Sequence, residues 1–251
     1  MSQTAPELSI IIPAYNEEKR LGRGLAHIRD YFASHPVGPG GIEILVVDDG
    51  STDGTAKVAQ DWANQESSLR LVSNGKNRGK GYSVRHGMLE ACGRIALFTD
   101  ADLSSPIEES EKLLAAIGAG NDIAIGSRAL DRSLIAVHQS RFREIAGMIF
   151  NGFVRLFTGL SFHDTQCGFK AFVREPCRVV FEQQRIERFG FDPEVLFLAR
   201  RRGLRIAEVP VRWAHDPATK VRVFRDSLLM FGDLAYIRWN WLLGRYPAKR
   251  A

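Results

Sequence analysis

The fold prediction starts from the stretch Arg94-Ile95-Ala96-Leu97-Phe98-Thr99-Asp100-Ala101-Asp102. It predicts a buried strand that delivers Asp100 and Asp102 to the loop at its carboxyl end. Residues two apart in an extended segment point the same way, so both carboxylates can face one ligand. Adjacent carboxylates repel each other, and Mg²⁺ or Mn²⁺ held between them and a phosphorylated ligand would relieve the repulsion. For this tripeptide alone, a solvated turn is the alternative.

Similar apolar runs recur along the first half of the chain. We predict strands at residues 8–12, 42–47, 69–73 and 122–125, with helical segments between them. Counting the strand that ends at Asp100, strand and helix alternate five times. This pattern is typical of α/β proteins with a Rossmann-like, mostly parallel sheet and flanking helices. Right-handed crossovers place the loops that follow the strands at one edge, where open α/β sheets bind ligands.

Polar side chains follow four of these predicted strands: Tyr15, Glu17, Asp48, Asp49, Asp100, Asp102 and Arg128. The Gly-x-Gly-x-x-Gly fingerprint and the P-loop sequence are absent, which disfavours both of those nucleotide-binding motifs. Carboxylates after the second strand suit hydrogen bonds to ribose hydroxyls or a base edge. Turn formation and helix capping are the alternative, and they explain part of residues 51–53.

The composition points to anionic partners. The 251 residues carry a net charge of +5, which favours phosphorylated small molecules, nucleic acid or an anionic membrane surface. We expect no nucleic acid partner, because acidic loops rather than basic and aromatic residues converge at the sheet edge. Three cysteines and the lack of a signal peptide indicate the cytoplasm. No apolar stretch reaches the ~20 residues that a membrane-spanning helix needs.

The second half of the chain is less regular. Residues 132–143 suggest a mobile basic loop, and residues 144–158 a helix. Residues 164–170 suggest a turn that lines the site, with Cys167 packed rather than nucleophilic. We expect an α/β domain over residues 1–221 and an amphipathic helical tail over residues 222–251. Trp and Tyr beside Arg fit a tail at a membrane interface, and a helix packed on the domain or in a dimer is the alternative.

Four motifs together resemble glycosyltransferase family 2, whose members have the GT-A fold. They are Pro13-Ala14-Tyr15-Asn16-Glu17, Asp48-Asp49-Gly50-Ser51-x-Asp53-Gly54-Thr55, Asp100-Ala101-Asp102 and Gly126-Ser127-Arg128. The resemblance covers nearly the whole chain. Within the family, the segments Asp164-Thr165-Gln166-Cys167-Gly168-Phe169-Lys170, Phe191-Asp192-x-Glu194 and Asp233-Leu234-x-x-Ile237-Arg238 are similar to dolichyl-phosphate β-glucosyltransferases. The related mannose synthases share the first four motifs but usually differ around Cys167.

The resemblance also implies roles for individual residues. The nucleoside would be held by Pro13, Tyr15, Glu17, Val47 and Asp49. The metal and the diphosphate would be bound by Asp100, Ala101 and Asp102, and the nucleotide sugar also by Arg128 and Lys220. The expected catalytic residues are Asp102, Arg128 and Asp164, with Glu194 as an alternative base. The lipid phosphate would be met by Arg141, Arg143 and Lys170.

The function implied is inverting transfer of glucose from UDP-glucose to a polyprenyl phosphate, by a cytoplasmic enzyme at the membrane surface. The acceptor phosphate monoester, with a second pKa of about 6, is largely a dianion at neutral pH and needs no strong general base. One alternative is a mannose synthase that uses GDP-mannose. Others are a family 2 transferase with a polysaccharide or protein acceptor, and a nucleotide-sugar binder without catalysis.

Overall fold

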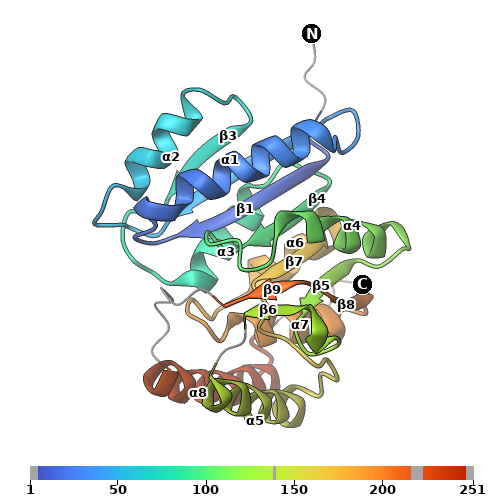
Figure 1. The fold of residues 1–251 in the computed structure, drawn as a ribbon. Coiled ribbons are helices and arrows are strands. Elements are labelled where there is room, and N and C mark those ends of the chain that lie inside the picture. Colours follow the sequence, from blue (N-terminus) through green and yellow to red (C-terminus); the bar gives the residue numbers. More distant parts are fainter. Residues whose placement is uncertain (1–4, 138–139, 216–222, 247–251) are drawn as a thin grey trace.

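A seven-stranded sheet with the order β3-β2-β1-β4-β7-β5-β8 organises the chain (Figure 1). The computed structural model describes residues 5–137, 140–215 and 223–246, without the side chains of residues 141–143 and 223–228. The strands are β1 (Leu8–Ala14), β2 (Ile42–Asp48), β3 (Leu69–Ser73), β4 (Ile95–Thr99), β5 (Ile123–Ser127), β7 (Phe169–Val173) and β8 (Ile206–Pro210). All neighbouring strands run parallel except at β7, which confirms the predicted mostly parallel α/β sheet.

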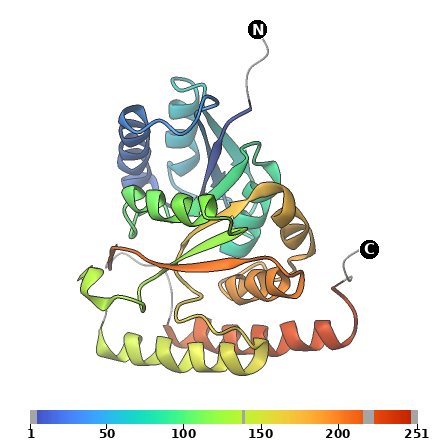
Figure 2. The same cartoon turned by 90° about the vertical axis from the view of Figure 1, so that its right-hand side faces the viewer.

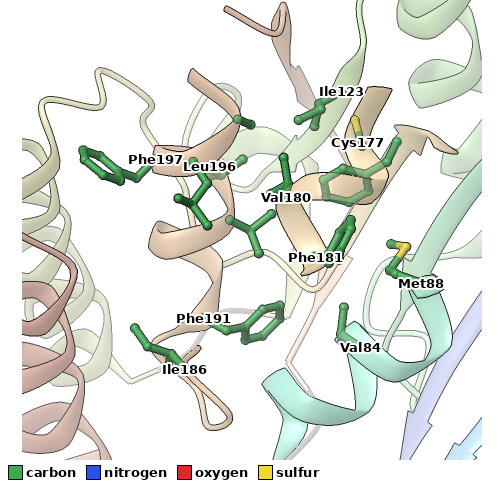
Figure 3. Close-up of a cluster of buried hydrophobic side chains, with 14 of the residues drawn as sticks. Val84, Met88, Ile123, Cys177, Val180, Phe181, Ile186, Phe191, Leu196 and Phe197 are labelled. Atoms are coloured by element: carbon green, nitrogen blue, oxygen red, sulfur yellow. The ribbon is translucent and has the colours of Figure 1, made fainter. Parts of the chain in front are cut away.

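Helices cover both faces of this sheet. One face is covered by α1 (Glu18–Ser34), α2 (Thr55–Ala63) and α4 (Ser110–Gly118), and the other by α3 (Lys80–Glu90), α6 (Arg174–Gln183) and α7 (Phe191–Arg201). Each face has its own apolar core. Figure 3 shows the second core, where Val84 and Met88 of α3 meet Phe181 of α6 and Phe191 at the start of α7. Because β1, β2 and β4 are buried on both faces, their sequences are continuous apolar runs.

The strand β7 was not predicted. Residues 169 and 170 were expected to belong to a turn, but the chain enters β7 there and runs antiparallel between β4 and β5. An antiparallel strand begins where its parallel neighbours end. The insertion of β7 therefore carries the segment 164–168 to the carboxyl end of β4, beside Asp100 and Asp102.

Two long helices form a further layer. The helices α5 (Arg141–Thr158) and α8 (Val223–Leu242) lie side by side below α7 (Figures 1 and 2). Leu234 and Ile237 of α8 are buried in the same core as α7, so the core extends into the segment predicted as a tail. None of the helices described here is both long and apolar enough to cross a bilayer.

Several short elements complete the fold. A two-stranded parallel sheet pairs β6 (Ile135–Val137) with β9 (Trp213–Ala214). The 3₁₀ helix η1 (Ile107–Glu109) precedes α4, and η2 (Arg132–Leu134) precedes β6. Part of the stretch expected to be a mobile basic loop is therefore regular structure, in which Arg132 pairs with Glu144 at 2.5 Å.

Candidate functional site

Two carboxylates follow β4. In the turn that they begin, the Leu103 N–H donates to the Asp100 carbonyl oxygen at 3.0 Å, and the Ser104 N–H donates to Asp102 Oδ1 at 2.9 Å. Leu103 has a φ of +49°, a left-handed conformation that costs a bulky residue about 1–3 kcal/mol. The turn fixes both carboxylates just beyond the end of the sheet.

The segment before β7 borders these carboxylates. Thr99, at the end of β4, pairs with Phe169 at the start of β7. A Cβ atom on residue 168 would lie 2.1 Å from Asp100 Oδ2, so only glycine fits at this position. Cys167 is 1% exposed, and burial raises the pKa of its thiol to about 11. A packed, protonated thiol agrees with the expectation that Cys167 is not a nucleophile.

A cation that the sequence analysis did not select lies at the same corner. Lys80, the first residue of α3, places Nζ 2.5 Å from Asp100 Oδ1. Burial lowers the pKa of Lys80, but the Asp100 and Asp192 carboxylates outweigh it, and the pKa lies above its ordinary value. The feature of the sequence that could have indicated Lys80 is its position between two glycines, Gly79 and Gly81. The structure explains the second glycine, because a Cβ on residue 81 would lie 2.7 Å from the Ile186 carbonyl oxygen.

Asp49 is connected to this corner through the backbone. Its Oδ1 accepts from the Asn74 side chain at 2.8 Å and from the Arg78 N–H at 2.9 Å. Its Oδ2 accepts from the Gly79 N–H at 2.7 Å. Because Lys80 follows Gly79 directly, the loops after β2 and β4 are linked through these two residues.

The loop after β1 joins the loop after β2. Asn16, with a φ of +54°, accepts the Thr52 N–H at 2.8 Å, and Glu17 pairs with Arg20. Tyr15 is 37% exposed, whereas Val47 is fully buried in the core. Any contact of Val47 with a nucleoside is therefore limited to its main chain, which lies beside Pro13 in the sheet register.

Arg128, which is half-buried, forms a fork with the buried Asp164. Arg128 Nε donates to Asp164 Oδ2 at 2.6 Å, and its Nη2 donates to Oδ1 at 2.9 Å. Burial alone would raise the pKa of Asp164, but the guanidinium and its hydrogen bonds lower it to about 2. A carboxylate of this kind is a weak base, and its role in this arrangement is to hold Arg128.

Lys170 is not at a surface open to a lipid phosphate. It is 1% exposed, and its Nζ donates to Asp192 Oδ1 at 2.5 Å and to the Cys167 carbonyl oxygen at 2.6 Å. The geometry therefore gives no support to the predicted lipid contact. Glu194 is fully buried as well, and Tyr246 near the end of the chain donates to its Oε1 at 2.6 Å.

Three other predicted phosphate ligands are only partly covered by the structure. Lys220 lies outside the described residues. Arg141 and Arg143 lie in the first turn of α5, without described side chains. Their predicted roles stay predictions.

The two carboxylates after β4 fit a divalent cation. Burial, and then the charge of Asp100, raise the pKa of Asp102 above its ordinary value, and a cation would relieve the second of these effects, the repulsion between the two carboxylates. Within the described residues no cluster of three or more His, Cys, Asp or Glu could hold a metal ion. Two carboxylates together with diphosphate oxygens are nevertheless a usual ligand set for Mg²⁺.

A pocket of about 430 Å³ opens beside the Arg128–Asp164 fork. Its walls come from α5, from the segment 163–166 and from Trp213. The volume lies within the range of about 300–1,000 Å³ that small-molecule sites occupy. The Arg128–Asp164 fork therefore faces a space large enough for a ligand.

Comparisons with known proteins identify the family. The model of glycosyl transferase family 2 matches residues 9–181. A dolichyl-phosphate β-glucosyltransferase of Drosophila melanogaster is 40% identical, with 96% of this chain and 77% of that protein covered. The Homo sapiens protein of the same name is 36% identical, again over 96% and 77%.

Solved structures show the same fold. Glucosyl-3-phosphoglycerate synthase of Mycobacterium tuberculosis, in complex with Mn²⁺, UDP and glucosyl-3-phosphoglycerate, has a TM-score of 0.64 at 21% identity, covering 98% of this chain and 82% of that one. The mannosyltransferase PcManGT of Pyrobaculum calidifontis, with GDP-Man and Mn²⁺, has a TM-score of 0.56 at 20% identity, covering 97% and 73%. The matching motifs, the GT-A fold and these relatives show that this chain is a glycosyltransferase and belongs to family 2.

Proposed function

We propose that this enzyme transfers glucose from UDP-glucose to a polyprenyl phosphate of the dolichyl type, with inversion at the sugar. The relatives named above are dolichyl-phosphate β-glucosyltransferases at 36–40% identity over 96% of the chain. The structural observation that carries the proposal is the segment 164–168. It contacts Asp100 at one end and holds Arg128 at the other, as a site for a diphosphate and an attacking phosphate requires.

On the donor side, Asp100 and Asp102 would hold Mg²⁺ or Mn²⁺ against the diphosphate, with Ala101 between them. That ion would offset the negative charge that develops on UDP as the bond to glucose breaks. Lys80 and Arg128 are fixed cations at the same corner, and they stabilise the same charge. The nucleoside would be bound by the loops after β1 and β2, through Pro13, Tyr15, Glu17, Val47 and Asp49.

On the acceptor side, a phosphate dianion attacks the sugar from the face opposite UDP. The dianion needs cations and correct placement rather than a strong base. Arg141, Arg143 and Lys220 are proposed to supply these cations, while Arg128, held by Asp164, faces the leaving diphosphate. Attack opposite an α-linked leaving group gives a β-linked product.

The helices α5 and α8 are proposed to rest on the cytoplasmic face of a membrane. Most of the large exposed apolar side chains of the described residues lie on these two helices, including Met148, Ile149 and Leu156 on α5 and Tyr236 and Trp239 on α8. Arg155 and Arg238 are exposed beside them. Aromatic and basic residues on an apolar helix face are typical of binding to anionic lipid interfaces.

A donor-by-acceptor panel tests the proposed reaction. Purified enzyme with Mn²⁺ is given UDP-glucose or GDP-mannose, each with a polyprenyl phosphate, the free polyprenol or no lipid. We expect sugar transfer only from UDP-glucose to the lipid phosphate. Turnover of GDP-mannose alone would make the protein a mannose synthase, and transfer that needs no lipid phosphate would refute the acceptor.

A further inference from the structure

The pocket beside the Arg128–Asp164 fork contains buried polar atoms that lack partners. Six side-chain atoms in the described part of the chain are buried without a hydrogen-bond partner, and three of them belong to residues that line this pocket. They are Asn151 Oδ1, Thr165 Oγ1 and Gln166 Nε2. An unsatisfied buried polar group costs about 1–3 kcal/mol, so three such groups on the residues of one pocket call for a partner there, either ordered water or the polar groups of a ligand that displaces it.

The orientation of Asn151 limits the chemistry of that ligand. Asn151 Nδ2 donates to the carbonyl oxygens of Phe162 at 3.1 Å and of His163 at 2.9 Å, so the amide is fixed with Oδ1 as the unpartnered atom. This oxygen can only accept a hydrogen bond. A phosphate dianion has no hydrogen to donate to it, whereas a sugar hydroxyl does.

The other two atoms complete a neutral set. Thr165 is 2% exposed, and its hydroxyl can donate or accept, while Gln166 Nε2 can only donate. One acceptor, one donor and one group of both kinds match the hydroxyls of a hexose, each of which donates and accepts.

The pocket adjoins the segment that contacts Asp100. Gln166 is two residues before Gly168, whose Cα faces the Asp100 carboxylate. Arg128 and Asp164 line the same pocket. A hexose joined to a diphosphate at Asp100 and Asp102 would therefore extend toward Thr165 and Gln166.

We propose that Asn151, Thr165 and Gln166 bind hydroxyls of the transferred hexose and make this pocket the site of sugar selection. The inference rests on the proposed function and adds the residues that recognise the sugar. Thr165 and Gln166 belong to the segment 164–168, which also contacts Asp100 and holds Arg128.

Calorimetric titration with UDP and with UDP-glucose, both with Mn²⁺, isolates the contribution of the sugar. In Thr165→Val and Gln166→Met we expect UDP to bind as in the wild type and UDP-glucose to bind about threefold to tenfold more weakly, as for one lost neutral hydrogen bond. Thr165→Ser retains the hydroxyl and should restore wild-type affinity for UDP-glucose. Gln60→Met on the exposed surface of α2 is the matched control, and thermal melting verifies that each variant is folded.

Other outcomes overturn the inference. Unchanged affinity for UDP-glucose in both variants, with a raised KM for polyprenyl phosphate, would assign the pocket to the acceptor. Equal weakening of UDP and UDP-glucose would assign these residues to the nucleotide or to folding. If the wild-type enzyme binds neither ligand, the proposed function itself is refuted. This result differs from the two outcomes above, in which only the assignment of the sugar fails.

Discussion

Both carboxylate oxygens of Asp164 accept hydrogen bonds from the Arg128 guanidinium, at 2.6 and 2.9 Å. It also accepts the Arg128 N–H at 3.0 Å and the Gln166 N–H at 3.0 Å. A carboxylate used in this way holds a cation and shapes the turn that contains Gln166. Asp164 thus positions Arg128 and the proposed sugar pocket together, which suits a reaction whose nucleophile is already an anion.

The pKa of Asp164 predicts how stability depends on pH. Its folded pKa of about 2 lies below the unfolded value of about 3.9. The contribution is therefore present above pH 4 and is lost as the pH falls toward 2. It amounts to about 2 kcal/mol at neutral pH, and about half of it is gone by pH 3.

Urea unfolding of wild type and Asp164→Asn between pH 6 and pH 3 measures this contribution. The wild-type advantage in unfolding free energy should stay nearly constant down to about pH 4 and fall to about half by pH 3. An advantage that stays constant would mean that the Arg128–Asp164 fork does not depress the carboxyl pKa.

Among the strands and helices, β7 determines which segments meet at the candidate site. Its antiparallel insertion brings the segment 164–168 to the carboxyl end of β4, although the two segments are far apart in sequence. The connector between α6 and α7 has a similar effect, because it packs against Gly81 and so fixes Lys80 at Asp100. Both contacts depend on glycines, which allow backbone and carboxylate to approach where a Cβ would collide.

The paired helices α5 and α8 give a prediction at this same scale. Leu156 and Trp239 are 76% and 59% exposed, so Leu156→Ser and Trp239→Ser should leave the fold intact. Each should reduce partitioning onto anionic liposomes about tenfold, because burial of a large apolar side chain contributes about 1.5–3 kcal/mol and about 1.4 kcal/mol is a factor of ten.

Co-sedimentation with liposomes measures this effect, and Lys57→Ser on α2, at the far end of the molecule (Figure 1), is the control. Wild-type sedimentation of both helix variants would favour a protein partner or a second copy on this face.

For the whole molecule, the sequence was sufficient wherever burial is uniform or a motif is local. The apolar runs of β1, β2 and β4 predicted the parallel sheet, and the Asp100-Ala101-Asp102 motif lies, as predicted, at the carboxyl end of β4. The sequence was insufficient where a charge is neutralised by a distant residue. Lys170 is buried because Asp192 compensates it, and a sequence pattern cannot distinguish such a lysine from an exposed phosphate ligand.

The tail shows the same limit. Its apolar and aromatic residues suited both a membrane and a packed helix, and the structure buries one face of the helix and leaves the other exposed. Leu234 and Ile237 are buried in the core, while Tyr236 and Trp239 are exposed. Which face of α8 is buried depends on the positions of α5 and α7, and these cannot be predicted from the sequence of the tail alone.

The central claim is that Asp100 and Asp102 hold a metal-bound UDP group at the carboxyl edge of the sheet. Calorimetric titration of UDP into wild type and Asp102→Ala, each with Mn²⁺ and with EDTA, tests it most directly. We predict UDP binding in the wild type that requires Mn²⁺ and is lost in a folded Asp102→Ala protein. Equal UDP affinity in both proteins, with or without Mn²⁺, would contradict the account.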